Sequence, residues 1–242
     1  MLKINSANNY VQPTFQSNFR VVTHGGNRLY QNTTTFFRND LNWQDFMNLL
    51  AAKYKNVDKV NVFNMACSDG SEPWSLAVAL MEKFGDKSQK FFPIVASDLD
   101  DVIIKRAKKE PCNISENDLL SMNHCTKDNY SKYFDAVRAT DLSFPLAVRP
   151  KPILDEKVDF KIATIQDEIK NIPPENSVVL CRNCWFYIPA SDRYMIAEEL
   201  SKRLAPSSLV VIGNLENGFG HEMLLKRFGF EETMVDNVYS KM

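Results

Sequence analysis

Residues 60–73 read VNVFNMACSDGSEP, and this stretch decides the fold. Val60–Ala66 is a short β-rich run, and Cys67–Gly70 is a cluster of turn-forming residues. A helix is predicted directly after the turn, because Pro73 suits the first positions of a helix and Gly85 suits its end. The stretch therefore predicts a strand, a tight turn and a helix in direct succession.

The same succession of elements returns further along the chain. Phe92–Ala96 predicts a second buried strand, and Asp100 is the expected N-cap of a helix that ends before Pro111. Asp40 is expected to cap a helix that precedes the first strand. Strands alternating with helices are typical of a parallel sheet with right-handed crossovers. Three further strands are expected at 158–163, 177–181 and 208–212.

The pattern predicts one main domain with two additions. Residues 1–31 are rich in Asn, Gln and Thr and are expected to form an N-terminal arm, while 32–242 form the domain. The alternation is interrupted at about 112–157, which predicts a small inserted subdomain with a short helix over about 127–136. The tail, 230–242, predicts two strands around a hairpin turn.

Composition excludes several classes of protein. The chain has 242 residues, with 29 Lys and Arg against 30 Asp and Glu, so its net charge of -1 lacks the basic surplus of a dedicated nucleic-acid binder. No run approaches the roughly 18 apolar residues that span a membrane, and the N-terminus turns polar at once. We therefore expect a cytoplasmic protein without membrane insertion. Only 8 residues are glycine, so a glycine-rich phosphate loop is disfavoured.

The turn after the first strand is the expected binding site, because ligands of a parallel sheet bind beyond the carboxyl ends of its strands. This turn holds one glycine, Gly70, and two carboxylates, Asp69 and Glu72, which would repel a pyrophosphate and favour a cationic ligand. Asp98 ends the second strand, where an acidic residue accepts hydrogen bonds from ribose hydroxyls. The alternative is that Asp98 is only a helix cap. A ribose beside a positive charge, without phosphate, describes S-adenosylmethionine.

Four blocks follow one another along the sequence: NTTTFFR at 32–38, ACSDGSEPWS at 66–75, ASDLD at 96–100 and CRNCWFY at 181–187. Together they resemble the CheR-type chemotaxis receptor methyltransferases. This resemblance extends from residue 32 to 216 and implies a Rossmann-like methyltransferase fold. The expected sheet is mostly parallel and seven-stranded, with a C-terminal antiparallel hairpin and a small inserted subdomain. The implied reaction transfers a methyl group from S-adenosylmethionine to a protein glutamate and leaves S-adenosylhomocysteine.

The resemblance also implies which residues form the site. Glu72 should hold the amino group of the cofactor's methionine, and Asp98 its ribose. Arg38 and Tyr187 should border the transferred methyl group and act as the catalytic residues. Other cofactor contacts are implied for Asn32, Thr34 and Arg38 on the N-terminal side, Ala66, Ser68 and Gly70 in the turn, Thr164 and Ile165 beside the adenine, and Asn183 and Cys184 after the fourth strand.

The sequence departs from the family pattern in ways that leave the substrate open. Asp69 and Ser71 stand where the family has Thr and Glu, and Thr164 stands where it has Asn. Only 31 residues precede the first block, too few for the helical domain that helps family members engage the receptor. The methyl acceptor is therefore a chemoreceptor-like protein, another protein side chain or a small molecule. A binding module without turnover is a further alternative, and the oligomeric state stays open.

Cys181 and Cys184 have the spacing of a redox pair or of half a zinc site. No second pair of cysteines has ligand spacing, since Cys112 and Cys125 lie 13 positions apart. We therefore expect no metal, and we expect Cys181 to end a buried strand.

Overall fold

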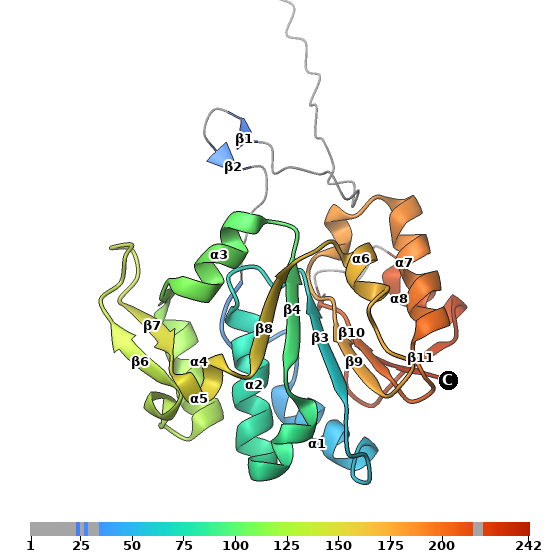
Figure 1. Ribbon diagram of the computed structural model, residues 1–242, viewed down its shortest axis with the longest axis horizontal. Coiled ribbons are helices and arrows are strands. Elements are labelled where there is room, and N and C mark those ends of the chain that lie inside the picture. Colours follow the sequence, from blue (N-terminus) through green and yellow to red (C-terminus); the bar gives the residue numbers. More distant parts are fainter. Residues whose placement is uncertain (1–22, 25–26, 29–33, 215–219) are drawn as a thin grey trace, which may run out of the picture.

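The computed structural model describes residues 23–24, 27–28, 34–214 and 220–242. Its centre is a seven-stranded sheet in the order β11-β12-β10-β9-β3-β4-β8 (Figure 1). Strand β12 runs antiparallel to both of its neighbours, and the pairs from β10 to β8 are all parallel. The strands are β3 (Asn61–Met65), β4 (Ile94–Asp98), β8 (Val158–Ile162), β9 (Ser177–Leu180), β10 (Leu209–Val211), β11 (Phe230–Glu232) and β12 (Val238–Lys241).

The order of the strands reverses between β3 and β9. The chain runs outward from β3 to β4 and β8, and then returns to place β9 on the other side of β3. Such a reversal is where an open sheet of this kind binds its ligand. The predicted fold class, a mostly parallel seven-stranded sheet with a C-terminal antiparallel hairpin, is confirmed.

Helices cover both faces of the sheet, which explains why its inner strands are apolar on both sides. Along β9, Val178 and Leu180 pack in one core cluster, and Val179 packs in the other. The first cluster takes side chains from α1 (Trp43–Lys53), α2 (Ser71–Phe84) and α3 (Asp101–Lys109). The second takes them from α6 (Ile165–Ile169), α7 (Ala190–Arg203) and α8 (His221–Arg227). Short 3-10 helices are η1 (Gly85–Phe91), η2 (Tyr130–Lys132) and η3 (Trp185–Tyr187).

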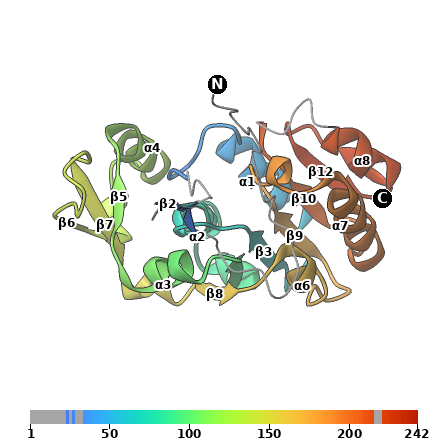
Figure 2. The same ribbon diagram turned by 90° about the horizontal axis from the view of Figure 1, so that it is seen from above.

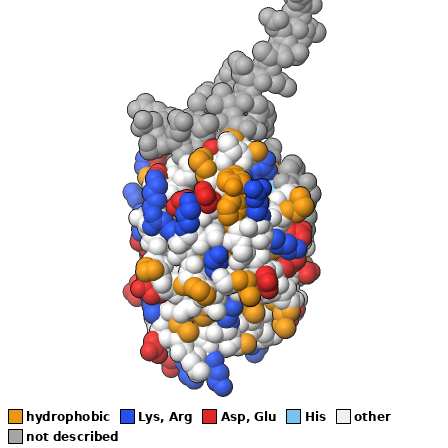
Figure 3. Space-filling view, turned by 90° about the vertical axis from the view of Figure 1, so that its right-hand side faces the viewer, with side chains coloured by type: hydrophobic (Ala, Val, Ile, Leu, Met, Phe, Trp, Pro, Cys, Tyr) orange, Lys and Arg blue, Asp and Glu red, His pale blue; other side chains and the backbone are white. Residues whose placement is uncertain are grey.

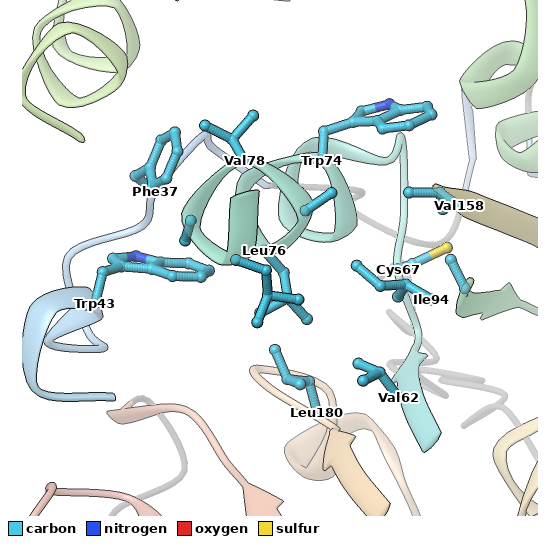
Figure 4. Close-up of a cluster of buried hydrophobic side chains, with 14 of the residues drawn as sticks. Phe37, Trp43, Val62, Cys67, Trp74, Leu76, Val78, Ile94, Val158 and Leu180 are labelled. Atoms are coloured by element: carbon cyan, nitrogen blue, oxygen red, sulfur yellow. The ribbon is translucent and has the colours of Figure 1, made fainter. Parts of the chain in front are cut away.

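Helix α2 is the centre of the first cluster (Figure 4). Its Leu76 is 1% exposed and points toward Val62 and Leu180 on the sheet. Burying a leucine fully stabilises a fold by roughly 1.5–3 kcal/mol. Phe37 and Trp43 lie together on one side of the helix (Figure 4), and their rings meet edge to face with centroids 5.4 Å apart. The segment before α1 is thereby fixed against the helix that follows the predicted binding turn.

A second sheet lies between α3 and β8 in the chain. Its order is β5-β7-β6, and it lies on the β8 side of the main sheet, at the opposite end of the molecule from α7 and α8 (Figures 1 and 2). The predicted limits of the inserted subdomain stay a prediction. This region holds β5 (Cys112–Ile114), α4 (Glu116–Thr126), β6 (Phe134–Val137), β7 (Leu146–Pro150) and α5 (Pro152–Asp155), while β1 (Thr23–His24) and β2 (Asn27–Arg28) pair near the N-terminus.

Two local predictions were wrong. No α-helix covers 127–136, where the structure has only η2 and the start of β6. The α-helix of this region is α4, which begins after Ser115, where Ser115 forms a capping box with Asp118. It ends at Thr126, because Lys127 adopts a left-handed conformation with φ 53°. The cap of α1 is Asn42, whose side chain accepts from the backbone N–H of Asp45, 3.1 Å away. Asp40 is thereby left for a different role.

The surface over α7 and α8 carries acidic, basic and hydrophobic side chains interspersed (Figure 3). Exposed hydrophobic residues there include Tyr194 and Met223. Across the part of the chain that the structure describes, every helix is too short or too polar to cross a lipid bilayer.

Candidate functional site

The turn after β3 has an uncommon backbone conformation. Ala66 and Ser68 have φ values of 57° and 53°, and Gly70 has 93°. Left-handed conformations are costly for residues with a Cβ and concentrate at functional sites. A Cβ on Gly70 would lie 3.0 Å from Phe160 Cζ and 3.0 Å from Trp74 Nε1, so a side chain there would also press these two rings outward. Glycine is therefore required at position 70 for both reasons.

Asp98 links the ends of β3 and β4. One carboxylate oxygen accepts from the backbone N–H of Ser68 and the other from that of Asp100, both at 2.9 Å. Burial raises the pKa of Asp98 to about 6, against the effect of these hydrogen bonds. Asp100 is the N-cap of α3, accepting from Val102 and Ile103, so the alternative of Asp98 as that cap is wrong. Asp98 lies where a ribose-binding carboxylate is expected.

The side chain of Asp69 is hydrogen-bonded to the start of α2. Its carboxylate accepts from the backbone N–H of Ser71 at 3.0 Å and from the Ser71 hydroxyl at 2.7 Å. The side chain therefore binds the first turn of α2, where a negative charge is favourable. The left-handed turn directs this carboxylate to the helix, and the repulsion of a pyrophosphate by its charge stays a prediction.

Glu72 lies in a buried cluster of charges. Its Oε2 accepts from Nη1 of Arg182 at 2.7 Å, and its Oε1 accepts from the side-chain amide of Asn64 at 2.5 Å. The Arg182 side chain is 0% exposed, and its Nη2 donates to Asp40. Arg182 thus bridges a carboxylate from the start of α2 to one from the segment before α1. A guanidinium fork suits two such partners.

The same cluster includes two of the predicted site residues. Asn183 donates its side-chain N–H to Oδ2 of Asp40 at 2.8 Å, and Nε of Arg38 lies 3.9 Å from the same oxygen. Arg182 also donates to the backbone oxygen of Arg38 at 3.5 Å, and its guanidinium stacks 5.7 Å from the ring of Trp43. The structure therefore brings Arg38, Glu72 and Asn183 together, as the resemblance implied.

Sequence reasoning missed Asp40, Asn64 and Arg182. Asn64 gave a signal, since it is a polar residue within the apolar β3 and is 0% exposed. A polar residue at such a position needs a partner, and here the partner is Glu72. Arg182 comes just after β9, where a charged residue usually turns to solvent.

The remaining predicted contacts lie at the same edge of the sheet. Thr164 is the N-cap of α6 and accepts from the backbone N–H of Asp167 at 3.1 Å, so its hydroxyl already serves the helix. Ile165 is 2% exposed. Asn183 adopts φ 57° and packs over Gly213, where a Cβ would lie 2.3 Å from its Oδ1. Roles in binding adenine stay predictions for Thr164 and Ile165.

Three predicted residues are less closely defined. Asn32 lies outside the described residues. Thr34 is the first described residue of its segment and is half-buried. Tyr187 ends η3, with its backbone N–H donating to the oxygen of Cys184 at 3.1 Å and its ring 4.0 Å from that of Phe186. Its place beside the transferred methyl group stays a prediction.

The site residues fit S-adenosylmethionine. That cofactor offers an ammonium group and ribose hydroxyls, which are donors, and the carboxylates of Glu72 and Asp98 have further lone pairs to accept them. The oxygen of the Asn64 amide and the hydroxyl of Ser68 are buried and make no hydrogen bond within the described residues. A pyrophosphate, which only accepts, fits these groups poorly. The exclusion of a dinucleotide thus rests on Glu72 and Asp98 rather than on Asp69.

A separate cavity of about 700 Å³ opens between α1, α2 and α4. Phe37 and Trp43 line it, together with Met47 and Leu120, whereas Glu72 and Asp98 do not. The cavity is therefore separate from the carboxyl edge of the sheet, where Glu72 and Asp98 lie. Within the described residues, no group of three or more His, Cys, Asp or Glu side chains has the geometry to hold a metal ion.

Comparison with known proteins decides the family. Residues 32–233 match the family described as CheR methyltransferase, SAM binding domain. The chain belongs to this family. The match covers all four blocks, and S-adenosylmethionine is the cofactor of the matched domain.

Curated relatives carry the same name. A chemotaxis protein methyltransferase of Salmonella typhimurium is 27% identical over 191 residues, covering 79% of this chain and 62% of that protein. One of Escherichia coli K12 is 27% identical over 202 residues, covering 84% of this chain and 65% of that protein. The chain thus spans less than two thirds of the length of these two relatives.

Solved structures of methyltransferases resemble the chain more distantly. Magnesium protoporphyrin IX methyltransferase of Synechocystis PCC 6803, with bound SAM, is 10% identical with a TM-score of 0.42, covering 83% of this chain and 78% of that one. A TehB-like SAM-dependent methyltransferase of Corynebacterium glutamicum is 12% identical with a TM-score of 0.43, covering 82% of this chain and 95% of that one. Similarity this low adds nothing to the assignment of the site.

Proposed function

We propose that this chain transfers a methyl group from S-adenosylmethionine to the side-chain carboxylate of a protein glutamate. The observation that carries the proposal is the family match over residues 32–233, whose blocks meet at the reversal between β3 and β9. The contacts among Arg38, Glu72 and Asn183 support it, because residues from three separate blocks join one cluster around Asp40 and Arg182.

The chemistry requires little from the protein beyond binding and positioning. When bound, S-adenosylmethionine supplies an electrophilic methyl group on a sulfonium. The accepting glutamate has an ordinary pKa of about 4.3 and is ionised at neutral pH, so no general base is needed. Holding two reactants in line contributes roughly 7–11 kcal/mol to lowering a barrier of this kind.

Each site residue has a task in this scheme. Glu72, held by Arg182, accepts from the cofactor's ammonium group, and Asp98 accepts from its ribose. Arg38 is about one quarter exposed, at 24% for its side chain, so its guanidinium is accessible to the carboxylate of an incoming substrate. Tyr187 offers an aromatic face to the sulfonium, worth on the order of 0.5–2 kcal/mol.

The test is methyl transfer with a chemically resolved product. Purified protein is incubated with S-adenosylmethionine carrying a radiolabelled methyl group and with a cytoplasmic extract, and the labelled proteins are treated with mild base. Carboxyl methyl esters release the label as methanol, whereas N-methyl groups keep it. We expect base-labile label that disappears with the Asp98→Ala variant. Base-stable label would assign a different acceptor, and absence of label with intact cofactor binding would favour a binding module.

A further inference from the structure

Two cysteines at the end of β9 lie in direct contact. Sγ of Cys181 and Sγ of Cys184 are 3.3 Å apart, and both residues are reduced. Cys181 is 0% exposed and Cys184 is 8% exposed. A disulfide needs its sulfurs about 2.05 Å apart, so the pair could be joined by a movement of little more than 1 Å.

The residues between these cysteines hold the proposed cofactor site. Arg182 binds Glu72 and Asp40, and Asn183 binds Asp40. A bond between the sulfurs would close a small ring that contains both residues. A change in the conformation of this ring would therefore move Arg182, which holds the Glu72 carboxylate expected to bind the cofactor's amino group.

The surroundings determine which end of the ring can move. The backbone of Cys181 is fixed on both sides: its N–H donates to Val211 at 2.9 Å, and its oxygen accepts from Trp185 Nε1 at 2.8 Å. Asn183 has a left-handed backbone with φ 57°. Closing the ring must therefore be accommodated mainly between Arg182 and Cys184, where the contacts with Asp40 and Glu72 begin.

We propose that Cys181 and Cys184 form a dithiol oxidation site, and that their disulfide lowers the affinity of the adjoining site for its cofactor. The oxidant is a hydroperoxide. One thiolate attacks an oxygen of the peroxide, which breaks the O–O bond and leaves a sulfenic acid; the other oxygen leaves and is protonated, as water from hydrogen peroxide or as an alcohol from an organic hydroperoxide. The second thiol then attacks that sulfur, the S–S bond forms and water leaves. A dithiol reductant returns both cysteines to thiols.

The other cysteines are less suited to this chemistry. Burial raises the pKa of Cys67 well above its ordinary value, and the nearby carboxylates of Asp98, Asp69 and Glu72 act in the same direction. Burial also raises the pKa of Cys112, and it raises that of Cys125 to about 11. A thiol reacts with peroxide as its thiolate, so the raised pKa values slow the reaction of these three thiols.

The disulfide is detected without reference to activity. Reduced protein is treated with hydrogen peroxide, remaining thiols are blocked, and the denatured chain is digested with trypsin. Cleavage after Arg182 separates Cys181 from Cys184, so peptides 171–182 and 183–193 stay joined only through a disulfide. We expect the joined pair, lighter by two hydrogen atoms than the sum of the two reduced peptides, and its loss after treatment with dithiothreitol.

Binding of S-adenosylhomocysteine, measured by calorimetry, tests the consequence. We expect oxidation to weaken binding by about tenfold or more, as for the loss of one charge-assisted hydrogen bond, and dithiothreitol to restore it. In the variants Cys181→Ala and Cys184→Ala, the ratio of affinities before and after peroxide should be close to one. In the matched control Cys125→Ser, the ratio should equal that of the unaltered chain.

The outcomes separate this inference from the proposed function on which its second half rests. Peptides that never join, or a joined pair with unchanged affinity, would overturn the dithiol site. A peroxide effect that persists in Cys184→Ala would also overturn it. Reduced protein that fails to bind S-adenosylhomocysteine would instead count against the proposed function, while the peptides still decide whether the disulfide forms.

Discussion

Two ion pairs in this chain have similar distances and very different surroundings. Arg182 and Glu72 are 2.7 Å apart, with side chains 0% and 13% exposed, at the carboxyl edge of the sheet. Lys105 and Asp101 are 2.6 Å apart on α3, with side chains 64% and 50% exposed. Water screens the second pair and not the first. The comparison shows that contact distance alone does not rank ion pairs, since the cost of leaving a charge without its partner depends on burial.

The two regions, α3 and the carboxyl edge of the sheet, also differ in their backbone conformations. Helix α3 is regular and is capped by Asp100. The carboxyl edge holds three left-handed residues that are not glycine, at positions 66, 68 and 183. Such conformations persist only where the surrounding contacts outweigh their cost. The buried charges and the unfavourable backbone therefore occur at one place, which is the place where the cofactor is expected.

The largest effect is expected from removing the buried cation. Arg182→Ala leaves Glu72 and Asp40 facing each other without their bridging charge, and should lower the free energy of unfolding by about 3–5 kcal/mol. Urea unfolding followed by circular dichroism measures this. Arg106→Ala is the matched control, because Arg106 pairs with Glu110 at 3.0 Å while half exposed. Equal losses in the two variants would remove the distinction between the regions.

The second effect concerns the turn rather than its charges. Gly70→Ala must adopt a left-handed conformation and also meet Phe160 and Trp74 at 3.0 Å, so we expect a loss of about 2–4 kcal/mol. Gly220→Ala is the control, since Gly220 has φ 76° but no atom of the described residues lies within 4 Å of the place its Cβ would take. Only the conformational cost of about 1–2 kcal/mol applies there. Comparable unfolding free energies for both variants would show that Gly70 is required for its backbone alone.

The sequence predicted the frame of this region and not its internal contacts. Apolar strands, the turn at Gly70 and the position of Asp98 follow from local patterns, because strand periodicity and turn residues act over a few positions. The bonds of Arg182 join residues 110 and 142 positions apart, to Glu72 and Asp40, and no local pattern contains them. The direction of the Asp69 carboxylate was not predicted for a related reason, since it depends on the left-handed turn around this residue.

The third expected effect is a pH dependence of cofactor affinity, which arises from the burial of Asp98 at the carboxyl edge. Because burial raises the pKa of Asp98 to about 6, the carboxylate that accepts from a ribose is present above that pH and is lost as the pH falls through it. The affinity for S-adenosylhomocysteine should therefore be constant from pH 7 to 8 and fall by up to about tenfold per unit below pH 6. Calorimetry in buffers of different ionisation enthalpy should detect proton release on binding at pH 5. Asp98→Asn should bind more weakly and without this dependence; a dependence that survives in that variant would assign it to another group.

The smallest effect on the free energy of unfolding is expected from breaking the exposed ion pair on α3. Lys105→Ala removes one partner of an exposed pair spaced four residues apart, and such pairs contribute about 0.3–0.5 kcal/mol in helices. The loss should shrink between 0.1 M and 1 M salt, because the screening length falls from about 10 Å to about 3 Å. The loss caused by Arg182→Ala should stay the same over that range, since salt does not enter a buried cluster. Urea unfolding of both variants at the two salt concentrations measures the contrast. If salt reduced both losses alike, ions would reach the charges at the carboxyl edge. The contact of Arg182 with Glu72 would then behave as an exposed ion pair, like the pair on α3.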